Sequence, residues 1–455
     1  MKFIKKYLNL TRLMRNTLIK GFIKSLLLIF SCGFLNFANA ALNLELTQAN
    51  DNAIPIAILP FKLPSNQNLP TDIKQIITND LKNSGEFNLF NNDSLTSASY
   101  TINDVDFSFW QEKNIDNVLV GTIETINGST YKITVNLLNS YGENKNDKII
   151  FTKSLIVNKN QLRHLAHTIA NDVYQKLLGV TGVFTTKIAY VKVKREETPY
   201  YRQAKYFLQI ADYDGYNPQT VLTSSEPIMS PAWASDGRRI AYVSFENHHT
   251  GIYISDIYTG KRSLITLFNG INGAPKFSHD GKKLLVSLSV DDANPKIYAI
   301  DLENKHATKL TKDFSADTEP FWGANNNEIF FTSNRSGNLQ IYKLNLASGE
   351  ITRLTFEGGY NAKASLTNDN KKLVLLHQDT NGYDVAVNNL ETSDMTILTN
   401  SGNAQSPSLA PNGKIIVYSD NYGNHGSLSF VTLDGKVKVD LPNNDGEISE
   451  PSWGP

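Results

Sequence analysis

The feature that most constrains this chain is a repeat that occupies its C-terminal part. A Pro-x-aromatic step, or a weaker copy of it, recurs at intervals of 44, 45, 44, 43 and 44 residues. A fixed period of this length indicates a repeat architecture, in which each unit buries its apolar face against its neighbours. The first positions of the six copies are Pro231, Pro275, Pro320, Ala364, Pro407 and Pro451.

Each repeat contains four short β-type segments that are separated by polar turns. The aromatic residue is followed by pairs such as Asp236-Gly237 and Asp280-Gly281, which favour tight connections between antiparallel strands. Ile240–Val243 and Ile252–Ile254 are typical second and third strands, and an apolar-Thr pair ends the fourth. Four strands in about 44 residues predict one blade of a β-propeller.

The two ends of the array predict how the propeller closes. Residues 450–453 are a first strand with nothing after it, while residues 187–223 supply second, third and fourth strands that lack a first. The last strand of the chain therefore completes the first blade. We expect six blades over residues 181–455, and closure leaves no sheet edge unpaired between the first and last blades. The repeated aromatic side chains, Trp233 and Trp453 among them, are expected to pack between blades.

Residues 41–180 lack the repeat and mix strands with helices. A helix over residues 69–82, with Thr71 as its N-cap, and a second over residues 161–178 have apolar residues on one face. Strands are expected at residues 54–61, 87–90, 117–126, 131–138 and 148–157. The fold class is therefore mainly β with an α/β part: an N-terminal α/β domain (41–180) precedes a six-bladed β-propeller (181–455) that the C-terminal strand closes.

Residues 1–40 have the features of a secretory signal peptide. They contain seven basic residues and no acidic one, then a short apolar run and the sequence Ala38-Asn39-Ala40. Cleavage is expected between Ala40 and Ala41. Two alternatives are lipidation at Cys32, which follows a poor match to a lipoprotein box, and an uncleaved anchor. Translation starting at Met14 would shorten the long basic region.

Removal of this segment changes the charge balance. The whole chain has 44 basic and 44 acidic residues, whereas the mature chain keeps 37 basic residues against 44 acidic ones, a net charge of −7. Such a chain lacks the basic face that a nucleic-acid binder needs. The mature chain would also have no cysteine, which suits an oxidising compartment outside the cytoplasm.

The sequence contains no catalytic motif that we can identify. Neither a Gly-x-Ser-x-Gly elbow nor a phosphate-binding glycine loop is present. His164 and His167 lie three residues apart on the helix over 161–178, but no second ligand pair accompanies them, so a solvated helix face is expected rather than a metal site. We therefore predict no enzyme activity, no cofactor and no metal. The alternative is an exported propeller enzyme that acts on a glycan or a peptide.

The remaining function is binding through loops at one end of the propeller. The segments that precede the first strands are rich in Asn, Gly, Glu and Ser. They are expected to share one face with the loops between second and third strands, and such polar faces suit a wet protein interface. Ordinary solvated turns are the alternative interpretation of any one of these residues.

At this point the residues support a family resemblance. Residues 41–455 resemble the TolB family, the periplasmic β-propeller proteins of the Tol–Pal system. The match rests on Ile54–Phe61, Ile115–Gly121, Asp172–Gly179 and, in the propeller, on the blade segments Asn272–Pro275, Thr318–Trp322 and Pro407–Gly413.

The resemblance implies a non-enzymatic, monomeric periplasmic protein with two partners. Such proteins bind the peptidoglycan-associated lipoprotein Pal through one propeller face and the inner-membrane protein TolA through the N-terminal segment, and they support outer-membrane invagination in cell division and envelope integrity. Some bacteriocins dock on the propeller, and contact with membranes is expected only through partners. The matching positions are Asn272, Gly273, Ala274, Thr318 and Glu319 for Pal, and Leu42, Leu44, Glu45 and Leu46 for TolA.

The alternating leucines of the N-terminal segment have a second interpretation. They fit strand addition to a partner's sheet, or an edge strand of the protein's own first domain. A segment that does both would couple the two binding events.

Overall fold

The computed structural model describes residues 43–46, 52–63, 69–91, 99–197, 202–290, 294–422, 425–441, 443 and 445–455. The predicted cleavage site at Ala40 and Ala41, and the predicted contact residue Leu42, lie outside these residues. The described residues all belong to one compact unit.

The N-terminal α/β part contains a five-stranded sheet in the order β3-β2-β4-β5-β6. β2 pairs in parallel with β3 and β4, and β4, β5 and β6 form an antiparallel meander. The strands are β2 (Ile54–Ile58), β3 (Phe87–Leu89), β4 (Asn117–Asn127), β5 (Thr130–Asn139) and β6 (Ile149–Asn158).

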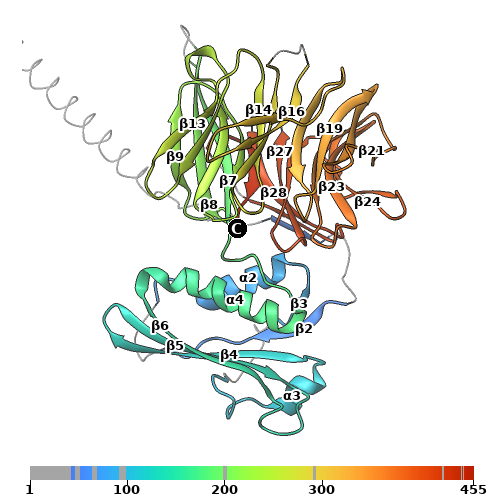
Figure 1. Ribbon diagram of the computed structural model, residues 1–455. Coiled ribbons are helices and arrows are strands. Elements are labelled where there is room, and N and C mark those ends of the chain that lie inside the picture. The colour runs from blue at the N-terminus through green and yellow to red at the C-terminus, as the bar shows by residue number, and fades with distance from the viewer. Residues whose placement is uncertain are drawn as a thin grey trace, which may run out of the picture. The chain divides into compact units, whose positions relative to one another are not determined.

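Two helices, α2 (Ile73–Asn83) and α4 (Leu162–Leu178), cover one face of this sheet (Figure 1). The N-cap of α2 is Asp72, not Thr71 as predicted, because the Asp72 carboxylate accepts a hydrogen bond from the Gln75 amide at 3.0 Å. The short helix α3 (Phe107–Glu112) covers the other face through Trp110, and the 3₁₀ turn η1 (Lys159–Gln161) leads into α4.

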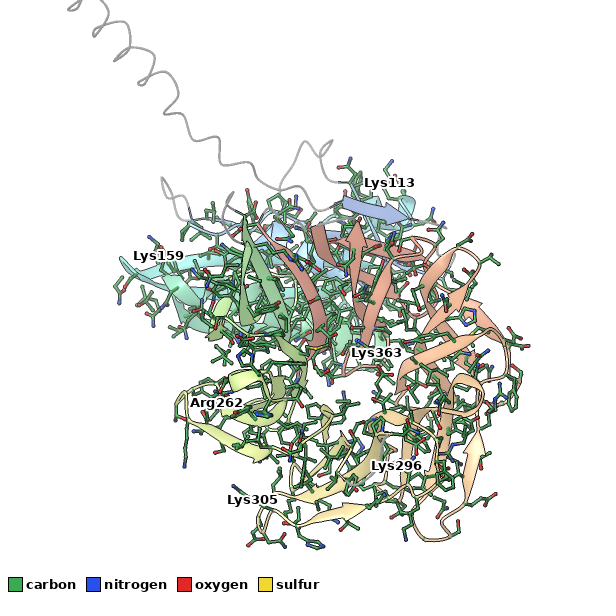
Figure 2. The ribbon with its side chains drawn as sticks, turned by 90° about the horizontal axis from the view of Figure 1, so that it is seen from above. Lys113, Lys159, Arg262, Lys296, Lys305 and Lys363 are labelled. Atoms are coloured by element: carbon green, nitrogen blue, oxygen red, sulfur yellow. The ribbon has the colours of Figure 1, made fainter. Side chains whose placement is uncertain are left out.

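The rest of the described chain forms six blades arranged around a central channel (Figure 2). The first blade is β30 (Glu447–Trp453), β7 (Lys187–Glu197), β8 (Arg202–Asp212) and β9 (Gln219–Ser224). The second and third are β10 (Ile228–Trp233), β11 (Arg239–Ser244), β12 (Gly251–Asp256), β13 (Arg262–Thr266), and β14 (Asn272–Phe277), β15 (Lys283–Leu288), β16 (Lys296–Asp301), β17 (Ala307–Lys309).

The last three blades continue the same order. They are β18 (Asp317–Trp322), β19 (Glu328–Ser336), β20 (Asn338–Asn345), β21 (Ile351–Arg353); then β22 (Tyr360–Leu366), β23 (Lys372–Asp379), β24 (Gly382–Asn389), β25 (Met395–Ile397); and β26 (Ala404–Leu409), β27 (Ile415–Tyr422), β28 (His425–Thr432), β29 (Val437–Asp440). The 3₁₀ turn η2 (Glu246–His248) lies between β11 and β12.

The predicted closure is confirmed. The C-terminal strand β30 pairs with β7, with Trp453 opposite Ile188, so the end of the chain completes the first blade. The repeated aromatic residues are buried as expected; Phe277, for example, packs with Val243 and Ile254 of the preceding blade. Packing of each blade on its neighbours is the arrangement that the repeat predicted.

The N-terminal segment forms strand β1 (Asn43–Leu46), but not in the sheet of the N-terminal domain. It pairs antiparallel with β29 at the outer edge of the last blade, with Leu44 opposite Val439 and Leu46 opposite Val437. The expectation of an edge strand in the protein's own first domain is therefore wrong, because β29 offers unpaired backbone groups that a strand can satisfy.

Candidate partner-binding face of the propeller

The first strand of each blade has a β-bulge at the same place. The register shifts between Gly273 and Lys276, between Thr318 and Phe321, and at equivalent points in the other blades. The residue just before the Pro-x-aromatic step has a positive φ in every blade, although none is glycine. These six residues, here called the mouth ring, are Ser230 (50°), Ala274 (46°), Glu319 (52°), Lys363 (51°), Ser406 (49°) and Glu450 (54°).

The bulges direct the mouth ring toward the channel, where all six residues line a cavity of about 140 Å³. The ring is held by a chain of polar contacts. The Glu319 carboxylate accepts from the Lys363 amide at 2.9 Å, and the Lys363 ammonium donates to Ser406 Oγ at 2.7 Å. Glu450 lies 3.4 Å from the same ammonium and accepts from the Ser230 amide at 3.2 Å.

Lys363 lies near the centre of the propeller, whereas Lys305 lies at its periphery (Figure 2). Burial alone would lower the pKa of the Lys363 ammonium, but Glu450 and Glu319 outweigh it and hold that pKa above its ordinary value. The ring is thus charged but internally paired, which makes it a fixed polar surface and leaves neither carboxylate as a free catalytic group.

The predicted Pal contacts Asn272, Gly273 and Ala274 lie at the start of β14. Asn272 is buried, accepts from the Phe268 amide at 3.1 Å, and donates to the Phe268 carbonyl at 2.8 Å and the Gly270 carbonyl at 3.1 Å. Its side chain therefore shapes the loop before β14. Gly273 and Ala274 are half-buried, and Ala274 belongs to the mouth ring.

Thr318 and Glu319 follow in the next blade, so the structure brings all five predicted residues to one region of the propeller. β14 and β18, which carry them, are adjacent first strands. The loops between second and third strands lie on the same face, as predicted: Thr250 donates to the Gly270 carbonyl at 2.8 Å, and Asn294 donates to the Phe314 carbonyl at 2.7 Å.

Apolar side chains are exposed on these loops. Phe314 is 98% exposed and Leu267 about half exposed, and neither was singled out from the sequence; Ile271, where the resembled family often has a polar His, is also about half exposed. A partner that covers this face would bury them, and buried apolar or aromatic anchors dominate binding energies. The only sequence signal for them is their position in the polar segments that precede the first strands.

A second polar cluster joins the α/β part to the first blade. His167 on α4 lies 2.7 Å from the Asp80 carboxylate on α2, which also accepts from the Tyr213 hydroxyl after β8. Asp214 pairs with Arg163 and lies 3.9 Å from the second His167 nitrogen. Burial raises the pKa of Asp80 to about 6, against the lowering effect of its hydrogen bonds to His167 and Tyr213.

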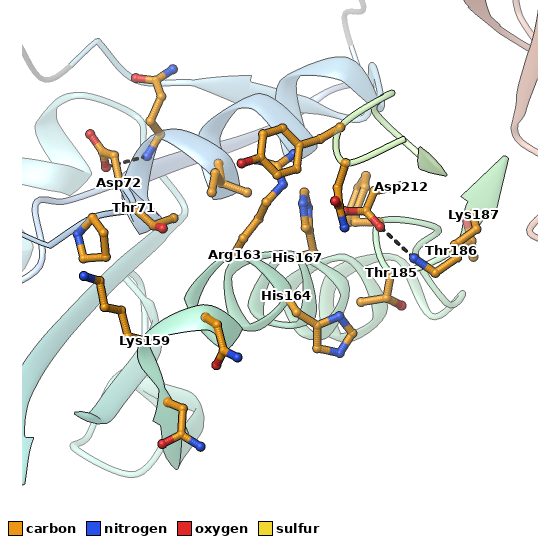
Figure 3. A pocket seen from close by; sticks show the side chains of 18 of the residues that line it. Thr71, Asp72, Lys159, Arg163, His164, His167, Thr185, Thr186, Lys187 and Asp212 are labelled. Carbon is orange, nitrogen blue, oxygen red and sulfur yellow. Dashed lines mark hydrogen bonds and ion pairs between the residues drawn. The ribbon is translucent and has the colours of Figure 1, made fainter. Parts of the chain in front are cut away.

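This cluster borders a cavity of about 1080 Å³, around which Figure 3 shows Arg163, His164, His167 and Asp212. The expectation of a solvated helix face is wrong for His167, which is 3% exposed, because Asp80 supplies a buried partner. Among the described residues no group of three or more His, Cys, Asp or Glu side chains could hold a metal ion. In the same part of the chain no helix is long and apolar enough to cross a membrane.

Comparisons with known proteins agree with this architecture. A family model for the TolB β-propeller domain matches residues 174–455, and one for the TolB amino-terminal domain matches residues 42–145. The Tol-Pal system protein TolB of Coxiella burnetii is 43% identical over 94% of this chain and 97% of its own length. The Pseudomonas aeruginosa protein of that name is 40% identical over 92% and 95%.

A solved structure gives the same result. The crystal structure of TolB from Acinetobacter baumannii is 36% identical, with a TM-score of 0.79 over 91% of this chain and all of that one. Fold and sequence together define a six-bladed propeller protein with a small α/β domain ahead of the blades. The chain belongs to the TolB family of Tol–Pal system proteins.

Proposed function

We propose that this chain is a non-catalytic periplasmic protein that links Pal to TolA and so supports outer-membrane invagination during division. The observation that carries the proposal is the face built by the mouth ring and its loops, in a chain that is similar to TolB proteins over nearly its whole length. Exposed apolar residues beside a fixed polar ring are the composition of a protein-binding surface.

The alternative, an enzyme acting on a glycan or a peptide, has less support. Catalysis of such hydrolysis needs a carboxylate or histidine free to move a proton. In the mouth ring, Glu319 accepts from the Thr332 hydroxyl at 2.8 Å and from the Lys363 amide, while Glu450 pairs with Lys363. Both carboxylates of the described ring are thus engaged in holding the blades.

The test is binding of the mature protein to the soluble domain of Pal. Thr318→Arg or Ile271→Asp should weaken binding at least about tenfold, because each places a charge in the buried centre of the interface. Tyr258→Arg is the matched control: Tyr258 is 73% exposed in the turn after β12, at the opposite end of the propeller. Equal affinity of all three variants, with unchanged circular dichroism, would refute the proposed face.

The N-terminal segment carries the TolA part of the proposal. Strand β1 occupies the edge of β29 through backbone pairing, and strand addition to a partner would use the same backbone groups. Deleting residues 41–46 should abolish TolA binding and change the dissociation constant for Pal. If both constants stay at their wild-type values, the segment has neither role.

A further inference from the structure

The Lys276 ammonium in the propeller channel has no partner among the residues that the structure describes. Lys276 follows Pro275 in β14, lines the cavity of the mouth ring and also lines a second cavity of about 290 Å³ further along the channel. Within the described residues its ammonium has neither a hydrogen bond nor an ion pair. Burial lowers the pKa of Lys276, and no nearby carboxylate offsets that effect.

The residues at the equivalent position in the other blades make Lys276 the exception. Directly after the proline, or after the residue that replaces it, stand Ala232, Phe321, Ser365, Ser408 and Ser452. These six positions form a second ring, in which Lys276 is the one charged side chain. The other five residues show that a neutral side chain can occupy this position. The Lys276 side chain is half-buried in the channel and has no counter-charge among the described residues, so an anion that enters the channel would meet an unpaired ammonium.

The carboxylates of the mouth ring do not supply it. Glu319 and Glu450 stand at repeat positions two residues before this second ring. Glu319 accepts from the Lys363 amide and the Thr332 hydroxyl, and Glu450 pairs with the Lys363 ammonium. The positive charge of Lys276 is therefore available to bind an anionic group that enters the channel.

Other donors face the same space. Ser365 and Ser408 line both cavities; Ser408 Oγ accepts from the Trp453 amide at 2.9 Å, which leaves its hydroxyl proton free to donate. An ammonium only donates, so the ligand that Lys276 would bind is an acceptor.

We propose that the propeller channel is a carboxylate-binding site, in which Lys276 binds the negative charge and the Ser365 and Ser408 hydroxyls donate to the same group. A single ammonium balances a single negative charge, so a monoanionic carboxylate fits better than the phosphate dianion. The carboxylate can belong to a free small acid or to an acidic side chain of a polypeptide that enters the channel.

Three of the four tryptophans of the chain, Trp233, Trp322 and Trp453, line the larger cavity. Tryptophan fluorescence of the mature protein therefore reports on its occupancy. The probes are acetate and a capped Gly-Gly-Asp-Gly-Gly peptide, with chloride, phosphate and the Asn version of the peptide as controls at equal ionic strength. Thermal unfolding gives a second readout, because a ligand that binds only the folded state raises the melting temperature.

Lys276→Met should weaken acetate or Asp-peptide binding at least about tenfold, since it removes a charged hydrogen bond. Lys276→Arg should retain binding. Lys312→Met, at an exposed lysine, is the matched control and should behave as wild type. Because Lys276 is half-buried and makes no hydrogen bond or ion pair with the described residues, Lys276→Met should be about as stable as wild type in chloride, so loss of folding cannot mimic the expected result.

The outcomes separate clearly. A saturable response to acetate that depends on Lys276 supports a site for free acids, and a Lys276-dependent response to the Asp peptide alone supports a site for an acidic side chain. No response to either probe, or the same response in Lys276→Met, overturns the proposal. None of these readouts depends on Pal, so this proposal can fail while the proposed function stands.

Discussion

At the scale of single residues, the mouth ring has a backbone conformation that the sequence repeat does not predict. The Pro-x-aromatic step was evident from its spacing, but the residue before it varies among Ser, Ala, Glu and Lys and gives no signal of a positive φ. Glycine is the residue that adopts this conformation without cost. Its absence from all six positions means that the blades hold the backbone in a strained conformation, which other interactions must stabilise.

Ala274→Gly tests this strain. A non-glycine residue in the left-handed region costs roughly 1–2 kcal/mol, and the extra entropy of glycine in the unfolded chain costs about 0.5–1 kcal/mol. We therefore expect the substitution to raise the free energy of unfolding by about 0.5–1 kcal/mol, measured by urea denaturation. Ala232→Gly, two positions further along in the neighbouring blade, where φ is not positive, should instead lower it. Equal destabilisation by both would show that Ala274 is not strained.

At the scale of elements, the helices and strands that depend on residues close together in the sequence were predicted, whereas contacts between segments far apart in the sequence were not. Apolar spacing gave α2 and α4, and turn residues gave the strands of each blade. The burial of His167 could not be foreseen, because its partner Asp80 lies 87 residues away on another helix. The pairing of β1 with β29 has the same cause: the two strands lie at opposite ends of the chain, and nothing local specifies the edge that β1 finds.

The Asp80 cluster makes stability depend on pH. Burial raises the pKa of Asp80 from 3.8 to about 6 in the folded protein, so folding favours the protonated carboxyl. Its contribution to stability is complete below about pH 4 and is lost as the pH rises through about 6. Relative to Asp80→Asn, the wild-type protein should lose up to about 3 kcal/mol of unfolding free energy between these limits.

Urea denaturation at a series of pH values measures this difference. The groups that face Asp80 are His167 from α4, and Tyr213 and Asp214 from the loop after β8. Asp379→Asn, at the exposed end of β23, controls for the general effect of removing a carboxylate. Parallel curves for wild type and Asp80→Asn would contradict the raised pKa.

At the scale of the whole molecule, closure of the propeller was predictable and its connection to the α/β part was not. The repeat period showed that the first blade lacks its first strand and that the C-terminal strand has no blade of its own. β30 was therefore expected to complete the first blade. The connection instead depends on a cluster that no period encodes: Trp453 donates to Thr186 Oγ at 2.8 Å, and its ring lies 5.2 Å from that of Phe430. Through the Trp453 side chain, the closing strand β30 thus contacts both the linker before β7 and strand β28 of the last blade.

Substitutions at Trp453 separate the two contributions of this side chain. Trp453→Ala removes the packing on Phe430 and should lower the free energy of unfolding by about 3–5 kcal/mol. Trp453→Phe keeps a ring and loses the hydrogen bond to Thr186, so a loss of about 1 kcal/mol is expected for that bond, in addition to a smaller packing loss. In the double variant with Thr186→Val the bond is already absent, so the two losses should not add. Full additivity would show that the bond contributes nothing, and a loss below about 1 kcal/mol for Trp453→Ala would show that closure does not depend on this residue.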